Sequence, residues 1–313
     1  MELVSIRIDS NIDVHTLLER FKLVFLNIAR LDEVEVNFSP CKFISVTTLT
    51  ALITLLKHIQ TIKPAIHLKI IEPAFDSTRI YIARMDFYRI LGIDYKEMFV
   101  RHSEIGRFMP VRNFQLTTGS HYEIVDNTIE IIKQKCELKP ELLYGLDMAF
   151  NEMLDNINEH SQSQNGGFFA VQSKHNTIEI CIADSGIGIA ESLRKNKLYN
   201  KLTDQECLEK AWEKGVSDGN GQGNGLYIAA RLIRLNGGLL SAFSKGAGYI
   251  ISPLDTSSFV LKNVYWPGTI ITLSIMRQNN IDMFDLLETN DVAELPVNYT
   301  DSLDEIDGAD VLW

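Results

Sequence analysis

The chain has 313 residues, 45% hydrophobic and 23% charged, and is long enough for two domains that each bury a core. The net charge is −11, whereas a nucleic-acid-binding protein typically has a basic surface. No apolar run is long enough to cross a membrane, and the opening MELVSIRIDS does not resemble a signal peptide. The four cysteines form no CxxC pair, so we expect neither a disulfide framework nor a zinc site, and we expect a cytoplasmic protein.

Residues 1–98 alternate between strand and helix patterns. Val4, Ile6 and Ile8 alternate as in a half-buried strand, and the apolar residues that follow recur at helical spacing. The predicted order is a strand at 4–8, a helix at 17–28, a strand at 34–38, a helix at 49–59 and a strand at 66–70. This order predicts one small α/β domain.

Residues 99–121 are irregular and contain Pro110, which predicts a linker or a hairpin. A second domain is predicted over residues 122–277. Its expected elements are helices at 121–136 and 140–161, strands at 167–173 and 177–183, helices at 204–214 and 226–235, and a strand at 269–275. Residues 278–313 contain ten acids and no Lys or Arg, mixed with apolar residues, which predicts an acidic, partner-binding tail outside the folded core.

The helix at 140–161 carries the first of three candidate functional motifs. Glu152, Asn156 and His160 recur at i, i+4 and i+8, so they form one polar stripe. An amide oxygen on this stripe can complete the shell of a Mg²⁺ ion held mainly by phosphates, and a carboxylate one turn away can deprotonate a nucleophile. Taken alone, the stripe is more typical of a solvated helix face.

The second motif follows a buried strand and reads Ala-Asp184-Ser-Gly186-Ile-Gly188. A carboxylate at a strand end can accept a hydrogen bond from the exocyclic amine of adenine, where guanine has an acceptor instead. Glycines allow the backbone to approach a base closely. The alternative for this motif is an ordinary Asp-Ser-Gly turn.

The third motif is the glycine cluster Gly219–Gly225, immediately before Leu226 and the helix that follows. Glycines allow backbone N–H groups to converge on an anion, and the positive end of a helix adds to that attraction. The spacing matches neither the Rossmann fingerprint nor a P-loop, because no Gly-Lys-Ser/Thr occurs. A flexible linker is the alternative.

In this order the three motifs resemble the GHKL superfamily of ATP-binding domains, which includes DNA gyrase, MutL and the histidine kinases. The resemblance covers residues 122–277 and implies a two-layer α/β sandwich of the Bergerat type, with ATP and Mg²⁺ as cofactors and a lid over residues 189–222. It implies that Glu152 is the general base and that Asn156 is the Mg²⁺ ligand. It assigns nucleotide binding to Asn156, Asp184, Gly186, Gly188, Gly221, Gly223, Gly225, Leu226 and Thr269.

Within the superfamily, the Glu152–Asn156 pair is similar to the gyrase-like ATPases and the anti-sigma-factor serine kinases. A histidine kinase is not expected, because His121 is too close to the motif for a helical hairpin to lie between them. Residues 33–56 resemble the STAS domains of anti-sigma-factor antagonists. The resemblance fails at the regulatory serine, where the sequence reads Ser45-Val46, so phosphorylation at that position is not expected.

We therefore predict a Mg-ATP-binding regulatory ATPase or serine/threonine protein kinase that has a degenerate STAS-like sensing or docking domain. The alternative is an ATP-gated interaction module with negligible turnover. The expected partners are regulatory proteins, with neither nucleic acid nor membrane involved, and homodimerisation is an expectation from the resemblance only.

Overall fold

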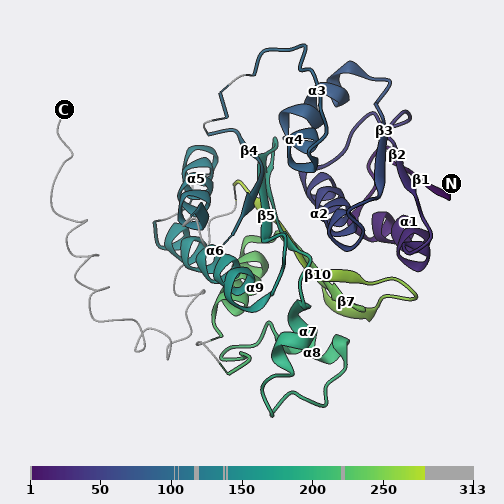
Figure 1. Cartoon of the computed structure of the whole chain (residues 1–313). Helices are drawn as coiled ribbons and strands as arrows, with labels where there is room; N and C mark the ends of the chain where they lie inside the picture. Colours follow the sequence, from purple (N-terminus) through teal and green to yellow (C-terminus); the bar gives the residue numbers. More distant parts are fainter. Residues whose placement is uncertain are drawn as a thin grey trace, which may run out of the picture.

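The computed structural model describes residues 2–101, 103–104, 106–115, 120–136, 138, 140–219 and 223–278. Among these residues the chain builds a three-stranded and a seven-stranded sheet, with helices packed against both (Figure 1). The predicted mixed α/β fold is confirmed. None of the described helices combines the length and apolarity that a membrane span needs.

The smaller sheet is built by the N-terminal region, where β2 lies between β1 and β3 and both pairs are parallel. The elements are β1 (Leu3–Arg7), α1 (Val14–Asn27), β2 (Glu33–Asn37), α2 (Val46–Ile62), β3 (His67–Ile71), α3 (Asp76–Arg84) and α4 (Phe87–Leu91). Asp13 and Ser45 cap α1 and α2 by accepting hydrogen bonds from backbone N–H groups of the first turn. The sequence did not predict α3 and α4, because helices of nine and five residues show little periodicity.

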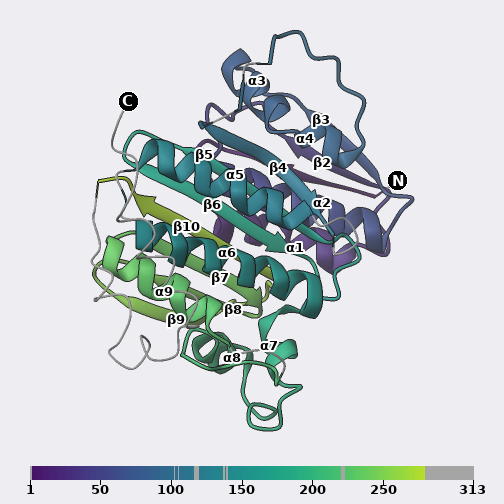
Figure 2. The ribbon, with the colours of Figure 1, turned by 90° about the vertical axis from the view of Figure 1, so that its left-hand side faces the viewer.

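The larger sheet is antiparallel, in the order β4-β5-β6-β10-β7-β8-β9. Its strands are β4 (Phe108–Phe114), β5 (Gly167–Ser173), β6 (Thr177–Asp184), β7 (Leu239–Lys245), β8 (Ala247–Ile251), β9 (Thr256–Val260) and β10 (Trp266–Met276). Three helices cover one face: α5 (Ser120–Lys135), α6 (Pro140–His160) and α9 (Gly225–Asn236) (Figure 2). Two short helices, α7 (Gly188–Leu193) and α8 (Asp204–Lys210), lie at one end of this layer. The arrangement is consistent with the predicted two-layer sandwich.

Residues 99–121, for which a linker or hairpin was predicted, contain β4, an edge strand of the larger sheet that pairs with β5. The pairing shifts register between Met109 and Arg112, around Pro110. Proline cannot donate to a strand ladder, so it is tolerated at a sheet edge or a bulge. The same residue that marked this segment as irregular therefore marks an edge strand.

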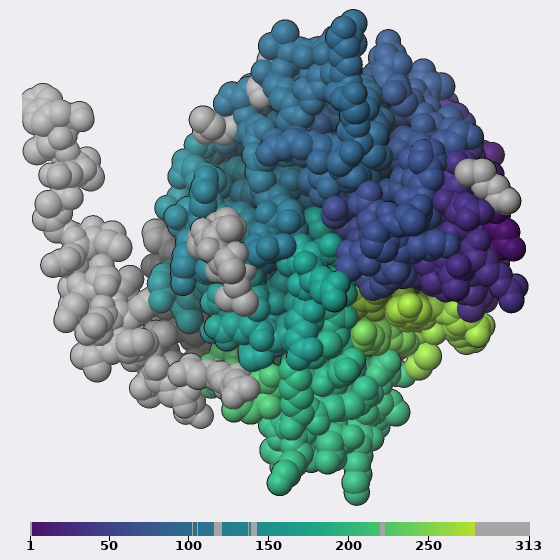
Figure 3. Space-filling view, in the orientation of Figure 1, coloured from purple at the N-terminus to yellow at the C-terminus, as the bar shows by residue number. Residues whose placement is uncertain are grey.

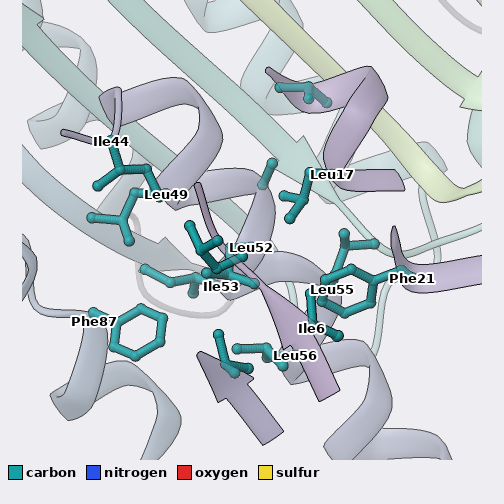
Figure 4. Packing of buried hydrophobic residues seen from close by; sticks show 14 of the residues in the cluster. Ile6, Leu17, Phe21, Ile44, Leu49, Leu52, Ile53, Leu55, Leu56 and Phe87 are labelled. Carbon is teal, nitrogen blue, oxygen red and sulfur yellow. The ribbon is translucent and has the colours of Figure 1, made fainter. Parts of the chain in front are cut away.

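Helix α2 lies between the two sheets. Its leucines, among them Leu52 and Leu56, share the core with Ile6 of β1 and Phe21 of α1 (Figure 4). The opposite side of α2 contacts β5, β6 and β10 of the larger sheet. A helix buried on both sides joins the two sheets into one structure.

The side of α2 that meets the larger sheet is rich in threonine. Thr50 and Thr54 are fully buried, and each donates its hydroxyl to a backbone carbonyl one turn earlier in the helix. At the end of α2, Thr61 donates to the side chain of Asn165 at 2.8 Å. These local bonds satisfy the hydroxyl groups, so small threonine side chains pack closely against a sheet without a lost hydrogen bond.

A single hydrophobic cluster therefore runs through both regions. It joins the core of the smaller sheet to residues on the second face of the larger one, namely Phe168, Ala170, Cys181, Ala183, Phe243, Trp266 and Ile270. The space-filling view shows the N-terminal region, in purple and blue, packed directly against the rest of the chain (Figure 3). A second cluster lies under α5, α6 and α9 on the other face.

Candidate functional site

A cavity of about 280 Å³ lies between α6, the carboxyl end of β6, β10 and the segment from α7 to α9. Most of the site residues predicted from the sequence line it: Glu152, Asn156, Asp184, Gly188, Gly223, Gly225, Leu226 and Thr269. Gly186 is absent from the lining, but its N–H bonds to Asp184. Gly221 lies outside the described residues.

Asp184 is the buried acid of this cavity, with 1% of its surface exposed. One carboxylate oxygen accepts the N–H of Gly186 at 2.7 Å, and the other accepts the N–H of Thr269 at 3.2 Å. Burial raises the pKa of Asp184 to about 7, although these two hydrogen bonds and the charge of Lys245 oppose the rise. Each carboxylate oxygen has more than one acceptor site, so the group can accept a further donor from a ligand.

The backbone around Asp184 is fixed from two sides. The indole N–H of Trp266 donates to the Asp184 carbonyl at 2.9 Å, and Trp266 itself is fully buried. A Cβ on Gly186 would lie 1.9 Å from the carbonyl oxygen of Ser161, so only glycine allows the loop to pass the end of α6. The position of the carboxylate therefore depends on packing from α6 and β10.

Helix α6 contributes the polar stripe that the sequence predicted. Glu152 and Asn156 both line the cavity and both remain exposed, so the cavity opens to solvent along this helix. Partial burial raises the pKa of Glu152, and the nearby Asp155 and Glu159 raise it further. A carboxylate with a raised pKa is a better proton acceptor.

The start of α9 lies against α6. A Cβ on Gly225 would lie 2.2 Å from the Cβ of Glu152, so glycine is required where the two helices meet. This close approach places the first backbone N–H groups of α9 beside the Glu152 turn. Those N–H groups have no partner within the helix and carry a partial positive charge, which suits an anion.

The comparisons with known proteins agree with this geometry. Residues 143–278 match the family model described as histidine kinase-, DNA gyrase B- and HSP90-like ATPase. These residues form a GHKL-type ATPase domain. No curated protein matches the chain in sequence. Strand β4 and helix α5 precede the matched residues but pack on the same sheet, so the structural unit begins before the match.

Domains of this family bind ATP, generally with Mg²⁺. Among the described residues, no group of three or more His, Cys, Asp or Glu side chains could hold a metal by itself. The donor set here fits an ion held mainly by phosphate oxygens, with one ligand from the protein. Asn156 meets that requirement, because its exposed amide lines the cavity.

The ATPase domain also contains a polar contact that the sequence did not predict. Nδ1 of His160, at the end of α6, lies 3.0 Å from a carboxylate oxygen of Asp218. Ser192 of α7 donates to the same oxygen at 3.4 Å. The sequence places His160 on the polar stripe but assigns it no role, and no sequence motif contains Asp218. The contact ties the predicted lid segment to α6, at the edge of the cavity.

Proposed function

We propose that this chain is a Mg-ATP-binding regulatory protein, an ATPase or serine/threonine protein kinase of the anti-sigma-factor-like GHKL type. The observation that carries the proposal is the buried Asp184 carboxylate, anchored by two backbone N–H groups in a cavity whose opposite side is the α6–α9 junction. A fixed carboxylate in such a cavity suits the exocyclic amine of adenine, and the start of α9 suits phosphates.

Two residues of α6 take separate roles in this proposal. Asn156 supplies one oxygen ligand to Mg²⁺, which when bound neutralises part of the phosphate charge. Glu152 accepts a proton from water or from a partner's hydroxyl, helped by the partial burial and the neighbouring acids that raise its pKa. The backbone groups that bind phosphate, at the start of α9, and the proton acceptor Glu152 of α6 then lie on two neighbouring helices, whose separation is fixed by the close contact at Gly225.

The N-terminal region is proposed to be a structural and docking domain. If the region is STAS-like, as proposed, its regulatory position is at the start of α2, where Val46 is fully buried and Ser45 is engaged as the N-cap. The backbone carbonyl of Thr47 lies 3.8 Å from the thiol of Cys181 in the ATPase domain. An interior position against another sheet favours packing over phosphorylation. The partner is proposed to be a regulatory protein.

The alternative function is an ATP-gated interaction module with negligible turnover, and the contact between His160 and Asp218 favours it. A lid that is tied to α6 can report whether the cavity is filled without any chemistry.

The experiment uses the purified full chain and two variants. Asp184→Asn places a donor where an acceptor is needed, so calorimetry is expected to show ATP affinity at least tenfold weaker and a smaller preference for ATP over GTP. Unchanged ATP affinity would contradict the pocket assignment. Glu152→Gln keeps the shape of the side chain, so nucleotide still binds while phosphate release falls by roughly 10²–10⁴-fold. Equal turnover in wild type and Glu152→Gln would favour the gated module.

A further inference from the structure

Lys245 occupies an unusual position for a lysine. Lys245 is the last residue of β7, where it pairs with Trp266 of β10, and with Gly246 it forms the two-residue connection between the paired residues Ser244 and Ala247 of the β7–β8 hairpin. Lys245 has φ +50°, in the left-handed region that glycine and asparagine favour. Where a residue breaks the local preference of its turn, the side chain itself is a candidate for function.

The side chain of Lys245 reaches the loop that follows Asp184. Its ammonium group donates to the carbonyl of Gly186 at 3.3 Å. A Cβ on Gly188 would lie 3.2 Å from Cγ of Lys245, so the aliphatic part of the lysine packs along the same loop. Gly186 in turn donates its N–H to the Asp184 carboxylate. The lysine thus contacts the loop that presents Asp184 to the cavity.

We propose that Lys245 is a positioning residue of the nucleotide site, which fixes the Asp184–Gly188 loop and supplies a positive charge that favours the ionised form of the Asp184 carboxylate. The inference rests on the proposed function, because it deepens the role given there to Asp184.

Lys245 is the group near Asp184 that can supply this positive charge. Burial raises the pKa of Asp184, and the ammonium group of Lys245 is the charged group that lowers it. The residues of β10 that donate hydrogen bonds to Asp184 are Trp266 and Thr269, which are neutral. The remaining titratable groups that line the cavity are Glu152, Asp155, Glu159, His160 and Asp218, on α6 and in the segment before α9. Most of these are acids, which cannot supply the positive charge that lowers the pKa of Asp184.

The N-terminal region faces the same lysine through α2. Burial lowers the pKa of His58 to about 4, and the positive charge of Lys245 contributes to the decrease. His58 is therefore neutral near pH 7 and does not repel the ammonium group. Its ring lies 6.0 Å from that of Phe25 of α1. The ionisable group of α2 that interacts with Lys245 is thus uncharged near pH 7 and does not weaken the lysine's interaction with Asp184.

The test is the pH dependence of binding of a fluorescent ADP analogue to the full chain. For a carboxyl group with a pKa of about 7 that binds only when ionised, affinity is about tenfold weaker at pH 6 than at pH 8. Lys245→Asn suits the turn but removes the charge, so its affinity is expected to fall a further three- to tenfold at pH 6 and 7 and to recover at pH 9. Lys245→Arg keeps the charge and the wild-type profile.

Three controls make the result specific. Lys262→Met removes an exposed lysine from the same domain and is expected to leave the profile unchanged. Asp184→Asn removes the titrating carboxyl group, so the pH dependence of binding that remains in this variant belongs to the phosphates of the probe. Adding Lys245→Asn to Asp184→Asn is expected to cause no further dependence on pH.

The outcomes separate this inference from the proposed function. Failure of the wild type to bind the analogue would contradict the proposed function itself. Wild-type binding with a Lys245→Asn profile that is parallel to wild type, whether equal or uniformly weaker at every pH, would overturn the role of the lysine charge. Lys245→Gln is a second neutral variant, in case Lys245→Asn does not fold.

Discussion

The core shared by the two sheets predicts that the N-terminal region and the ATPase domain unfold together. Leu56 of α2 is fully buried in the cluster that continues into the larger sheet. Leu56→Ala deletes core atoms on the N-terminal side and leaves the ATPase domain's own residues unchanged. If the cluster is one cooperative unit, the ATPase domain loses stability as well.

The expected magnitude follows from the burial of Leu56. Replacing a fully buried leucine by alanine costs about 2–5 kcal/mol, because transfer free energy is lost and a cavity remains. At roughly 2 °C per kcal/mol for a chain of this size, the melting temperature falls by roughly 4–10 °C. The matched control is Leu26→Ala on α1, where the leucine is 68% exposed and the same deletion is expected to change the melting temperature little.

Tryptophan fluorescence provides the assay. The chain has three tryptophans, and in a Trp313→Phe background the remaining two, Trp212 and Trp266, are both buried in the ATPase domain. Leu56→Ala is expected to lower the melting temperature seen by these two probes and the one seen by far-UV circular dichroism by the same amount. A tryptophan transition that stays at the wild-type temperature, with a separate earlier loss of circular dichroism, would show that the regions unfold independently.

Three other predictions concern the helix junction, the N-terminal region and the tail. Gly225→Ala forces α9 away from Glu152, so the free energy of unfolding should fall by about 1–3 kcal/mol in a thermal unfolding experiment and nucleotide affinity should fall as well. The control is Gly246→Ala, whose new Cβ would meet only a side-chain oxygen at 3.3 Å. Equal effects of the two changes would refute the argument. Mass spectrometry of protein from cells should find residues 43–50 mostly unmodified, and stoichiometric phosphate on Ser45 or Thr47 would overturn this. The acidic tail lies outside the described residues from 279 onwards. Deletion of residues 280–313 should leave ATP affinity within about threefold and abolish a salt-sensitive association with the protein partner, and capture of that partner at full strength by the truncated chain would refute the proposal.

The sequence alone was sufficient for the main elements and for most of the candidate site. In strands such as Thr177–Asp184 an isoleucine recurs at every second position, and long amphipathic helices such as α6 repeat at helical spacing, so local periodicity predicts them. Each of the three motifs has its chemically important residues within one short segment: an acid and an amide one helical turn apart, an acid before glycines, and glycines before a helix. Each of these can be recognised without knowing what lies next to it.

The tertiary structure decided which surfaces are buried. The apolar stripe of α2, with Leu52 and Leu56, predicted one buried side, and the threonines on the other side are typical of a solvated face. Thr50 and Thr54 are nevertheless fully buried against the larger sheet, because their hydroxyls bond to the helix backbone. Hydroxyl groups that are satisfied locally look the same in a sequence whether the helix face meets water or another sheet.

Contacts between distant segments were also beyond the sequence. His160 and Asp218 are separated by a lid segment, and Lys245 reaches Gly186 across 59 positions. The sequence around a charged residue does not reveal which partner that residue will meet, because charge acts through space and not along the chain. Local patterns therefore identified the motifs whose residues line the cavity, while the fold alone determined which charges surround Asp184 and which residues contact its loop.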